Sequence, residues 1–172
     1  MPSPPARLPQ TGEGRVGLPA FGEQVGRIAA AERGDGWLAA CEDAGRFLAL
    51  CRELVASLGG LLRGLDAGPV LEVAAGRGEL AGGLTAAGIG VIATDADPPA
   101  GAPVQRAAAG EALQQYRPAV VLGSFVPVDL EGDAAVMRCP SVRHYIVLSA
   151  RIGGLLGSAA LWANDAWSAR PL

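Results

Sequence analysis

The chain has 172 residues, of which 50% are hydrophobic and 18% are charged, so it can fold around a sizeable core. Its net charge of −3 gives no general reason to bind nucleic acid or an anionic membrane, and we expect neither partner. All 14 basic residues are arginine, which excludes a Schiff-base lysine and a P-loop lysine within this sequence.

Residues 1–20 are rich in proline and glycine, and we expect this segment to be loose. Residues 21–172 are expected to form a single domain. No signal-peptide pattern is visible, and the longest apolar stretch, Tyr145–Ala163, is interrupted by Arg151 and several glycines. The chain is therefore expected to be cytoplasmic and to have no membrane span.

Three cysteines are present, Cys41, Cys51 and Cys139, and their spacing matches no zinc pattern. The single histidine, His144, would have to complete any metal site built on them. We therefore expect no metal, and we interpret the thiols as small buried or half-buried side chains in a reducing compartment.

The sequence predicts two helices before the first strand. The first helix is predicted at Phe21–Arg33 and is expected to end at Gly34. From Trp37 to Leu58, apolar residues then recur at steps of three and four, which is typical of one amphipathic helix. We expect Gly59-Gly60 to end this second helix, and we expect its apolar stripe to cover one face of a sheet.

The segment from Val70 to Asp97 predicts a strand, a glycine turn, a helix and a second strand ending in Asp95. This is half of a nucleotide-binding βαβ unit. Gly76 and Gly78 would let the backbone of the turn approach a ligand closely. A carboxylate at the tip of the second strand, Asp95, can accept both hydroxyl groups of a ribose.

Three further strands are predicted, at Val104–Arg106, Ala119–Ser124 and Tyr145–Ser149. In open α/β sheets ligands bind beyond the carboxyl ends of the strands. The loop from Ser124 to Asp129 should therefore face the substrate. His144 precedes the fifth strand, so we expect it at the opposite end of the sheet and do not assign it as a general base.

The segment Glu72-Val73-Ala74-Ala75-Gly76-Arg77-Gly78 resembles motif I of the class I S-adenosylmethionine-dependent methyltransferases, E/D-x-G-x-G-x-G, with Ala74 replacing the first glycine. Ala109-Gly110-Glu111-Ala112-Leu113 looks like the "G-D-A" loop of that family, whose acid commonly receives the adenine amino group. The resemblance covers roughly residues 60–150 and includes no substrate-defining signature.

This resemblance implies an S-adenosylmethionine-dependent methyltransferase domain acting on a small molecule by in-line displacement at the sulfonium methyl group. The expected fold is α/β: a doubly wound, mainly parallel sheet of order 3-2-1-4-5, shortened, with helices on both faces. Cofactor-binding residues would be Glu72, Ala74, Gly76, Gly78, Asp95, Ala96, Glu111 and Ser124. Asp129 is a candidate base for the methyl acceptor, and no other catalytic residue is visible.

Several of these residues have structural alternatives. Glu72 can instead fix the backbone of the glycine turn, because a buried carboxylate needs hydrogen bonds. Asp95 can be a helix cap or an Asx turn, and Asp97 is better explained by turn chemistry. Glu111 can stabilise the start of a helix, and Asp129 can cap one.

Two other functions stay open. Gly76, Gly78 and Ala81 loosely satisfy the G-x-G-x-x-G/A pattern of nicotinamide-dependent enzymes, although Glu72 inside the strand counts against that class. A non-catalytic binding or assembly protein that keeps the nucleotide-binding fold is favoured by Ala74 and by the short segment after Ser149.

That short segment leaves little room for the helix and hairpin that usually complete a methyltransferase sheet. We expect the sheet to be shortened, left with an open edge or completed by a partner chain, with a two-fold homodimer as the predicted arrangement. Trp162 and Trp167 are interpreted as packing residues that cover an apolar edge or an interface, and stacking on a planar acceptor is the alternative.

Overall fold

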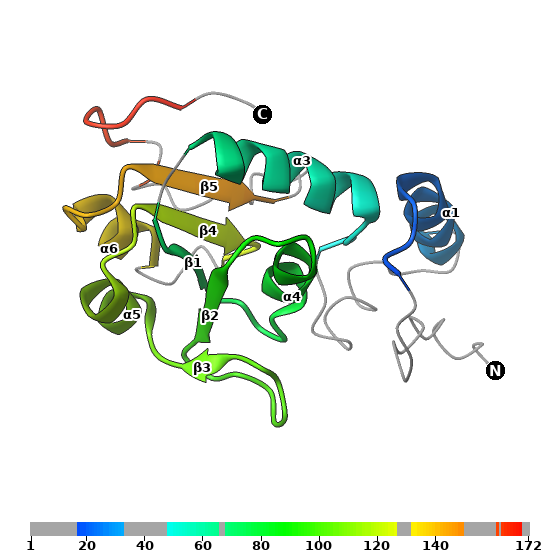
Figure 1. The fold of residues 1–172 in the computed structure, drawn as a ribbon, viewed down its shortest axis with the longest axis horizontal. Helices are drawn as coiled ribbons and strands as arrows, with labels where there is room; N and C mark the ends of the chain where they lie inside the picture. The colour runs from blue at the N-terminus through cyan, green and yellow to red at the C-terminus, as the bar shows by residue number, and fades with distance from the viewer. Residues whose placement is uncertain are drawn as a thin grey trace.

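The computed structural model describes residues 17–32, 48–65, 68–126, 132–149, 161 and 163–169. Five parallel strands form one sheet in the order β3-β2-β1-β4-β5 (Figure 1). They are β1 (Val70–Val73), β2 (Val91–Asp95), β3 (Gln105–Arg106), β4 (Val120–Ser124) and β5 (His144–Leu148). The predicted α/β class and strand order are therefore confirmed, and the sheet is wholly parallel in this part of the chain.

The central strands are buried on both faces, which explains their continuous apolar sequences. All four residues of β1 are buried, and so are the first four of β4. Because successive side chains of a strand point to opposite faces, Val70 joins one hydrophobic cluster and Leu71 joins the other. The sheet is thus the middle layer between two apolar cores.

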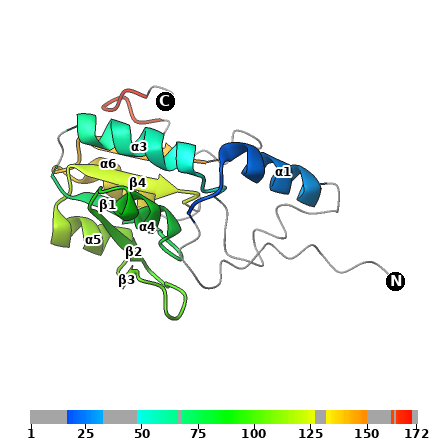
Figure 2. The ribbon, with the colours of Figure 1, turned by 45° about the vertical axis from the view of Figure 1, so that its right-hand side comes forward.

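Helices cover both faces, as Figure 2 shows for α3 (Arg52–Gly64) above the sheet and α5 (Ala109–Tyr116) below it. The core on the first side is built from α3 and α4 (Glu79–Ala86), through residues such as Leu58 and Leu84. The second core receives Leu113 from α5 and Val136 from α6 (Gly132–Arg138).

The predicted bounds of the second N-terminal helix are wrong. Residues 33–47 lie outside the described part of the chain, residues 48–51 are not helical, and α3 begins at Arg52. It continues through Gly59 and Gly60, which were expected to end it, as far as Gly64. The reason is tertiary: Leu58 and Leu62, on successive turns of α3, are both buried in the first core, and this burial outweighs the low helix propensity of the two glycines.

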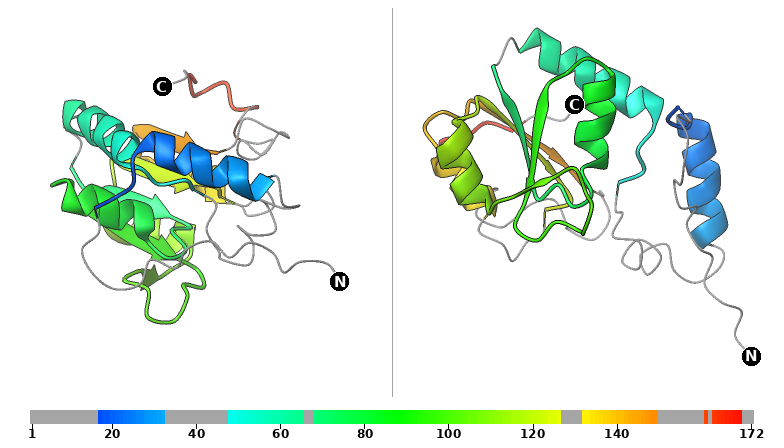
Figure 3. Two further views of the ribbon diagram at one scale, coloured as in Figure 1. Left: turned by 90° about the vertical axis from the view of Figure 1, so that its right-hand side faces the viewer. Right: turned by 60° about the horizontal axis from the view of Figure 1, so that its bottom comes forward.

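The first helix, α1 (Phe21–Glu32), is close to its predicted range. It lies beside the start of α3 and apart from the sheet (Figure 3). Two hydrogen bonds attach it: Phe21 N–H donates to Glu53 Oε2 at 2.8 Å, and Gln24 Nε2 donates to Leu50 O at 2.7 Å. Residues 1–20 were predicted to be loose. Residues 1–16 of that segment lie outside the described part of the chain.

The residues after β5 are described only in part. Residues 150–160 and Trp162 lie outside the description. Trp167 is half-buried and packs against the second core, and Asn164 Nδ2 contacts Met137 Sδ at 3.6 Å. A packing role for Trp167 therefore agrees with the structure. No helix in the described ranges has the length and apolarity needed to cross a membrane.

Candidate functional site

A cavity of about 640 Å³ lies at the carboxyl ends of β1, β2 and β4. Its walls come from the glycine turn after β1, the tip of β2, the start of α5 and the segment leading from β4 into α6. Since β1 lies between β2 and β4, this is the point where the chain reverses its direction of winding, which is where open α/β sheets bind ligands. The volume is within the range of about 300–1,000 Å³ found for small-molecule sites.

The turn after β1 has an unusual backbone. Ala74, Gly76 and Gly78 have φ angles of 50°, 55° and 72°, all in the left-handed region that favours glycine. Ala75 N–H donates to Thr94 O at 3.0 Å, which attaches the turn to β2. Ala74, where motif I would have its first glycine, therefore occupies a conformation that suits glycine better.

The two glycines of the turn serve different purposes. A Cβ built on Gly76 would have no atom within 4 Å, and Gly76 lines the cavity. A Cβ on Gly78 would lie 2.7 Å from Val104 Cγ2, and Gly78 is not among the cavity-lining residues. Gly76 thus leaves space for a ligand, whereas Gly78 leaves space for the chain that leads into β3.

Glu72 lies beneath the turn and is only 2% exposed. Its Oε2 accepts the N–H of Ala81 at 3.0 Å, so the carboxylate caps the first turn of α4. Burial raises the pKa of this carboxyl from its ordinary value of 4.5 to about 7, and the hydrogen bond from Ala81 opposes the shift. The same side chain also lines the cavity. The structural alternative for Glu72 is thus visible, and it coexists with a position at the site.

Asp95 holds the tip of β2 against the glycine turn. Its Oδ2 accepts the N–H of Gly76 at 2.8 Å, and its Oδ1 accepts the N–H of Asp97 at 2.8 Å. The second contact is an Asx turn, the structural alternative considered for this residue. Each carboxylate oxygen keeps another lone pair, so these bonds leave Asp95 able to accept ribose hydroxyl groups in the cavity that it lines.

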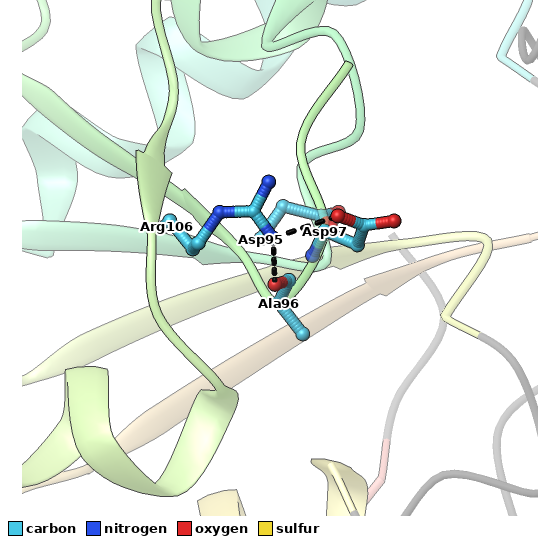
Figure 4. A network of polar contacts seen from close by, with 4 residues as sticks. All are labelled: Asp95, Ala96, Asp97 and Arg106. Carbon is cyan, nitrogen blue, oxygen red and sulfur yellow. Dashed lines mark hydrogen bonds and ion pairs between the residues drawn. The ribbon is translucent and has the colours of Figure 1, made fainter. Parts of the chain in front are cut away.

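Asp97 points away from the core and is paired with Arg106 of β3. Arg106 Nη1 donates to Asp97 Oδ1 at 2.7 Å and to Ala96 O at 3.1 Å (Figure 4). The side chain of Asp97 is 90% exposed, so this ion pair contributes little to stability. Its effect is local: it connects the cavity-lining loop at Ala96 to the edge of the sheet.

The remaining predicted residues are distributed unevenly. Ser124 ends β4 and lines the cavity. Glu111 does not line it; its Oε2 accepts the N–H of Ala108 at 3.2 Å at the start of α5. Asp129 lies outside the described residues. His144 begins β5 opposite Val120, at the amino end of the sheet and away from the cavity.

The charged side chains that line the cavity are predominantly acidic. They are the carboxyl groups of Glu72, Glu79, Asp95 and Asp97 and the guanidinium of Arg77. Because the pKa of Glu72 is about 7, three full negative charges, a partial one and one positive charge are present among the described lining residues near neutral pH, and this balance favours a cationic ligand over an anionic one. No group of three or more metal-ligating side chains that could hold an ion occurs in the described ranges.

Sequence reasoning found one wall of the cavity only in part: it expected the loop from Ser124 to Asp129 to face the substrate, but it assigned no part of α6 to the site. Phe125 and Val126, directly after β4, line it together with Gly132 and Ala135 of α6. The position of Phe125 after a buried strand was a signal for this role. The approach of α6 depends on packing between segments that are separate in the sequence, and no local pattern reveals it.

No family model, curated protein or solved structure matches the chain.

Proposed function

We propose that the protein binds S-adenosylmethionine in this cavity and transfers its methyl group to a small molecule. The observation that carries the proposal is the position of Glu72. Its carboxyl group already accepts the hydrogen bond from the Ala81 N–H at the start of α4. The same turn contains Gly76, where the space beside the backbone is open. A helix start that is already capped by a carboxylate favours a cation beside it and disfavours a phosphate.

This position separates the proposal from a nicotinamide-dependent enzyme. Dinucleotide-binding proteins of this topology place a pyrophosphate at the start of the helix after β1. Here that place has a buried carboxylate, and three further acids line the same cavity. S-adenosylmethionine instead carries a sulfonium and an ammonium group, whose positive charges match an acidic cavity.

The roles of the other residues follow from their positions. Asp95, at the tip of β2, would accept the ribose hydroxyl groups, and the chain around Ala96 and Ala108 would contact the adenine. S-adenosylmethionine supplies an already activated methyl group, so proximity and alignment can provide most of the catalysis. A catalytic dyad is therefore not required of this chain, and the acceptor would enter from the side of Phe125.

Calorimetric titration tests the cofactor. We expect S-adenosylhomocysteine to bind, whereas oxidised and reduced nicotinamide dinucleotides should show no binding under the same conditions. Tighter binding of either dinucleotide would contradict the proposal. Transfer of label from radiolabelled S-adenosylmethionine to a small-molecule extract distinguishes an enzyme from the non-catalytic alternative, which would bind the cofactor and label nothing.

A matched pair of glycine variants locates the cofactor. Gly76→Ala should weaken S-adenosylhomocysteine binding at least tenfold, about 1.4 kcal/mol, because its Cβ would enter the cavity. Gly88→Ala is the control, since Gly88 also has positive φ, at 83°, has no atom within 4 Å of its Cβ position and lies outside the cavity. Equal affinities for the two variants would remove the turn from the binding site.

A further inference from the structure

One basic side chain lies among the acidic groups of the cavity. Arg77 lines the cavity together with Glu72, Glu79, Asp95 and Asp97, and it is exposed. Within the described part of the chain, its guanidinium forms no hydrogen bond or ion pair with these acids or with any other residue. The N–H donors of this guanidinium are therefore available to a ligand in the cavity.

Other arginines of the described chain have structural partners. Arg63 Nη2 donates to Ala87 O at 3.1 Å, which joins α3 to the end of α4. Arg106 Nη1 donates to Asp97 Oδ1 at 2.7 Å, at the edge of the sheet. Arg77 has no contact of this kind, so the position of its charge beside the cavity is not explained by the stability of the fold.

The backbone on either side of Arg77 is fixed at the cavity. Gly78 N–H donates to Ala75 O at 2.8 Å, which closes a four-residue turn with Gly76 and Arg77 at its centre. Gly76 N–H donates to Asp95 Oδ2 at 2.8 Å, so the turn is attached to the tip of β2. The turn therefore keeps Arg77 at the cavity, although its long side chain can still adjust to a ligand.

The amino-acid end of S-adenosylmethionine carries a carboxylate as well as an ammonium group. The carboxyl groups of Glu79, Asp95 and Asp97 repel a negative charge in the cavity. On the charge of these acids alone, the cavity would bind the decarboxylated cofactor, which keeps both positive charges, more tightly than the complete cofactor. A cavity that holds the complete cofactor therefore needs a base for the carboxylate, and Arg77 is the base that the described lining supplies.

We propose that Arg77 binds the carboxylate of the cofactor and is a specificity-determining residue, because it makes the site prefer the complete cofactor to the decarboxylated form. A planar guanidinium can donate two parallel hydrogen bonds to a carboxylate. The preceding residue, Gly76, has open space beside its backbone, so an amino-acid group can approach the turn. This inference rests on the proposed function, since it concerns the cofactor of the same site.

Two ligands that differ only in the carboxylate test the preference. S-adenosylhomocysteine has this group, and S-adenosyl-3-thiopropylamine is the same molecule without it. In calorimetric titrations, we expect the wild-type protein to bind S-adenosylhomocysteine at least about tenfold more tightly than the amine. Equal affinities, or tighter binding of the amine, would overturn the inference.

A matched pair of variants assigns the preference to the guanidinium. Arg77→Gln removes the positive charge, so it should lose at least about tenfold in affinity for S-adenosylhomocysteine. Its affinity for the amine should be unchanged or higher, and retained binding of the amine also shows that the variant is folded. Arg143→Gln makes the same change in net charge at an exposed residue that precedes β5, at the amino end of the sheet and outside the cavity lining. It should leave both affinities unchanged.

The outcomes separate this inference from the proposed function. If the wild-type protein binds S-adenosylhomocysteine and Arg77→Gln changes the affinities for both ligands equally or not at all, the role of Arg77 is contradicted and the cofactor proposal stands. Absence of S-adenosylhomocysteine binding to the wild-type protein contradicts the proposed function and this inference with it. Binding of ADP-ribose that Arg77→Gln abolishes would assign the guanidinium to a phosphate and would also overturn the inference.

Discussion

At the scale of single residues, Ala74 has a backbone conformation that a glycine would adopt more easily. A left-handed conformation costs an L-residue roughly 1–2 kcal/mol. Ala74→Gly should therefore raise the free energy of unfolding by about 1 kcal/mol, after allowance for the greater flexibility of glycine in the unfolded chain. Equilibrium denaturation in urea measures the change.

The neighbouring alanine provides the control for this prediction. Ala75 is in the same turn but does not have positive φ, and its N–H donates to Thr94 O. Ala75→Gly should lower the free energy of unfolding by about 0.5–1 kcal/mol. If the two variants change stability in the same direction, strain at Ala74 is not the reason.

Glu72 should make stability depend on pH. Its carboxyl has a pKa of about 7 in the folded protein, against an ordinary 4.5, so the folded state binds this proton more tightly. The free energy of unfolding should therefore fall as the pH rises from about 4.5 to 7, and this contribution should be constant above that window. Glu72→Gln removes the titration but keeps an oxygen for the Ala81 N–H. At pH 8 it should be more stable than wild type by about 2–3 kcal/mol.

A second variant separates the hydrogen bond of Glu72 from its titration. Glu72→Leu also abolishes the charge, but it leaves the buried N–H of Ala81 without its acceptor. It should be less stable than Glu72→Gln by about 1–3 kcal/mol. A wild-type unfolding free energy that stays level between pH 4.5 and 7 would contradict the raised pKa.

At the scale of elements, Gly78 couples the start of α4 to the segment that precedes β3. Gly78→Ala would bring a Cβ to 2.7 Å from Val104 Cγ2, at a residue whose φ is 72°. We expect a loss of about 2–3 kcal/mol in the free energy of unfolding, from backbone strain and overpacking together. Thermal and urea denaturation both report it.

A double-mutant cycle isolates the steric part. Val104→Ala removes the Cγ2 atom, so Gly78→Ala combined with Val104→Ala should cost less than the sum of the two single variants by about 1 kcal/mol. Simple additivity would show that strain at Gly78 accounts for the whole effect, and that the contact with Val104 is unimportant.

At the scale of the whole molecule, β5 pairs with β4 on one side and with no other strand in the described chain. Proteins rarely leave a long strand edge open, and a symmetric dimer is the commonest way to cover one. We therefore expect the protein to form a two-fold dimer. Light scattering across a concentration series should show a mass near twice 17.4 kDa at high micromolar concentration.

The tail, residues 163–169 after β5, offers another way to cover the open edge of that strand. Trp167 packs against the second core, so the chain can also supply its own cover. A species of 17.4 kDa at every concentration would contradict the dimer. If Trp167→Ala then made the mass rise with concentration, the tail would be identified as the element that prevents self-association.

The sequence alone predicted the α/β class, the strand order and the edge of the sheet at which the cavity lies. The class and the edge depend on local patterns: apolar runs for buried strands, a glycine turn between strand and helix, and the rule that ligands gather at the carboxyl ends of parallel strands. The strand order came from the resemblance of motif I to a family with a doubly wound sheet. Gly76 and Asp95 come directly from those patterns, and the structure places both on the cavity.

Tertiary structure decided the features that depend on contacts between distant parts of the chain. Gly78 faces Val104, and α3 continues through Gly59 because the first core receives its next turn. The sequence placed Phe125 on the substrate side, but its attachment to β5 through the hydrogen bond from its N–H to Leu148 O is tertiary. Hydrophobic periodicity predicts which side of a helix or strand is buried, but it does not predict which other segment that side contacts. Those contacts depend on how the layers pack together in the tertiary structure.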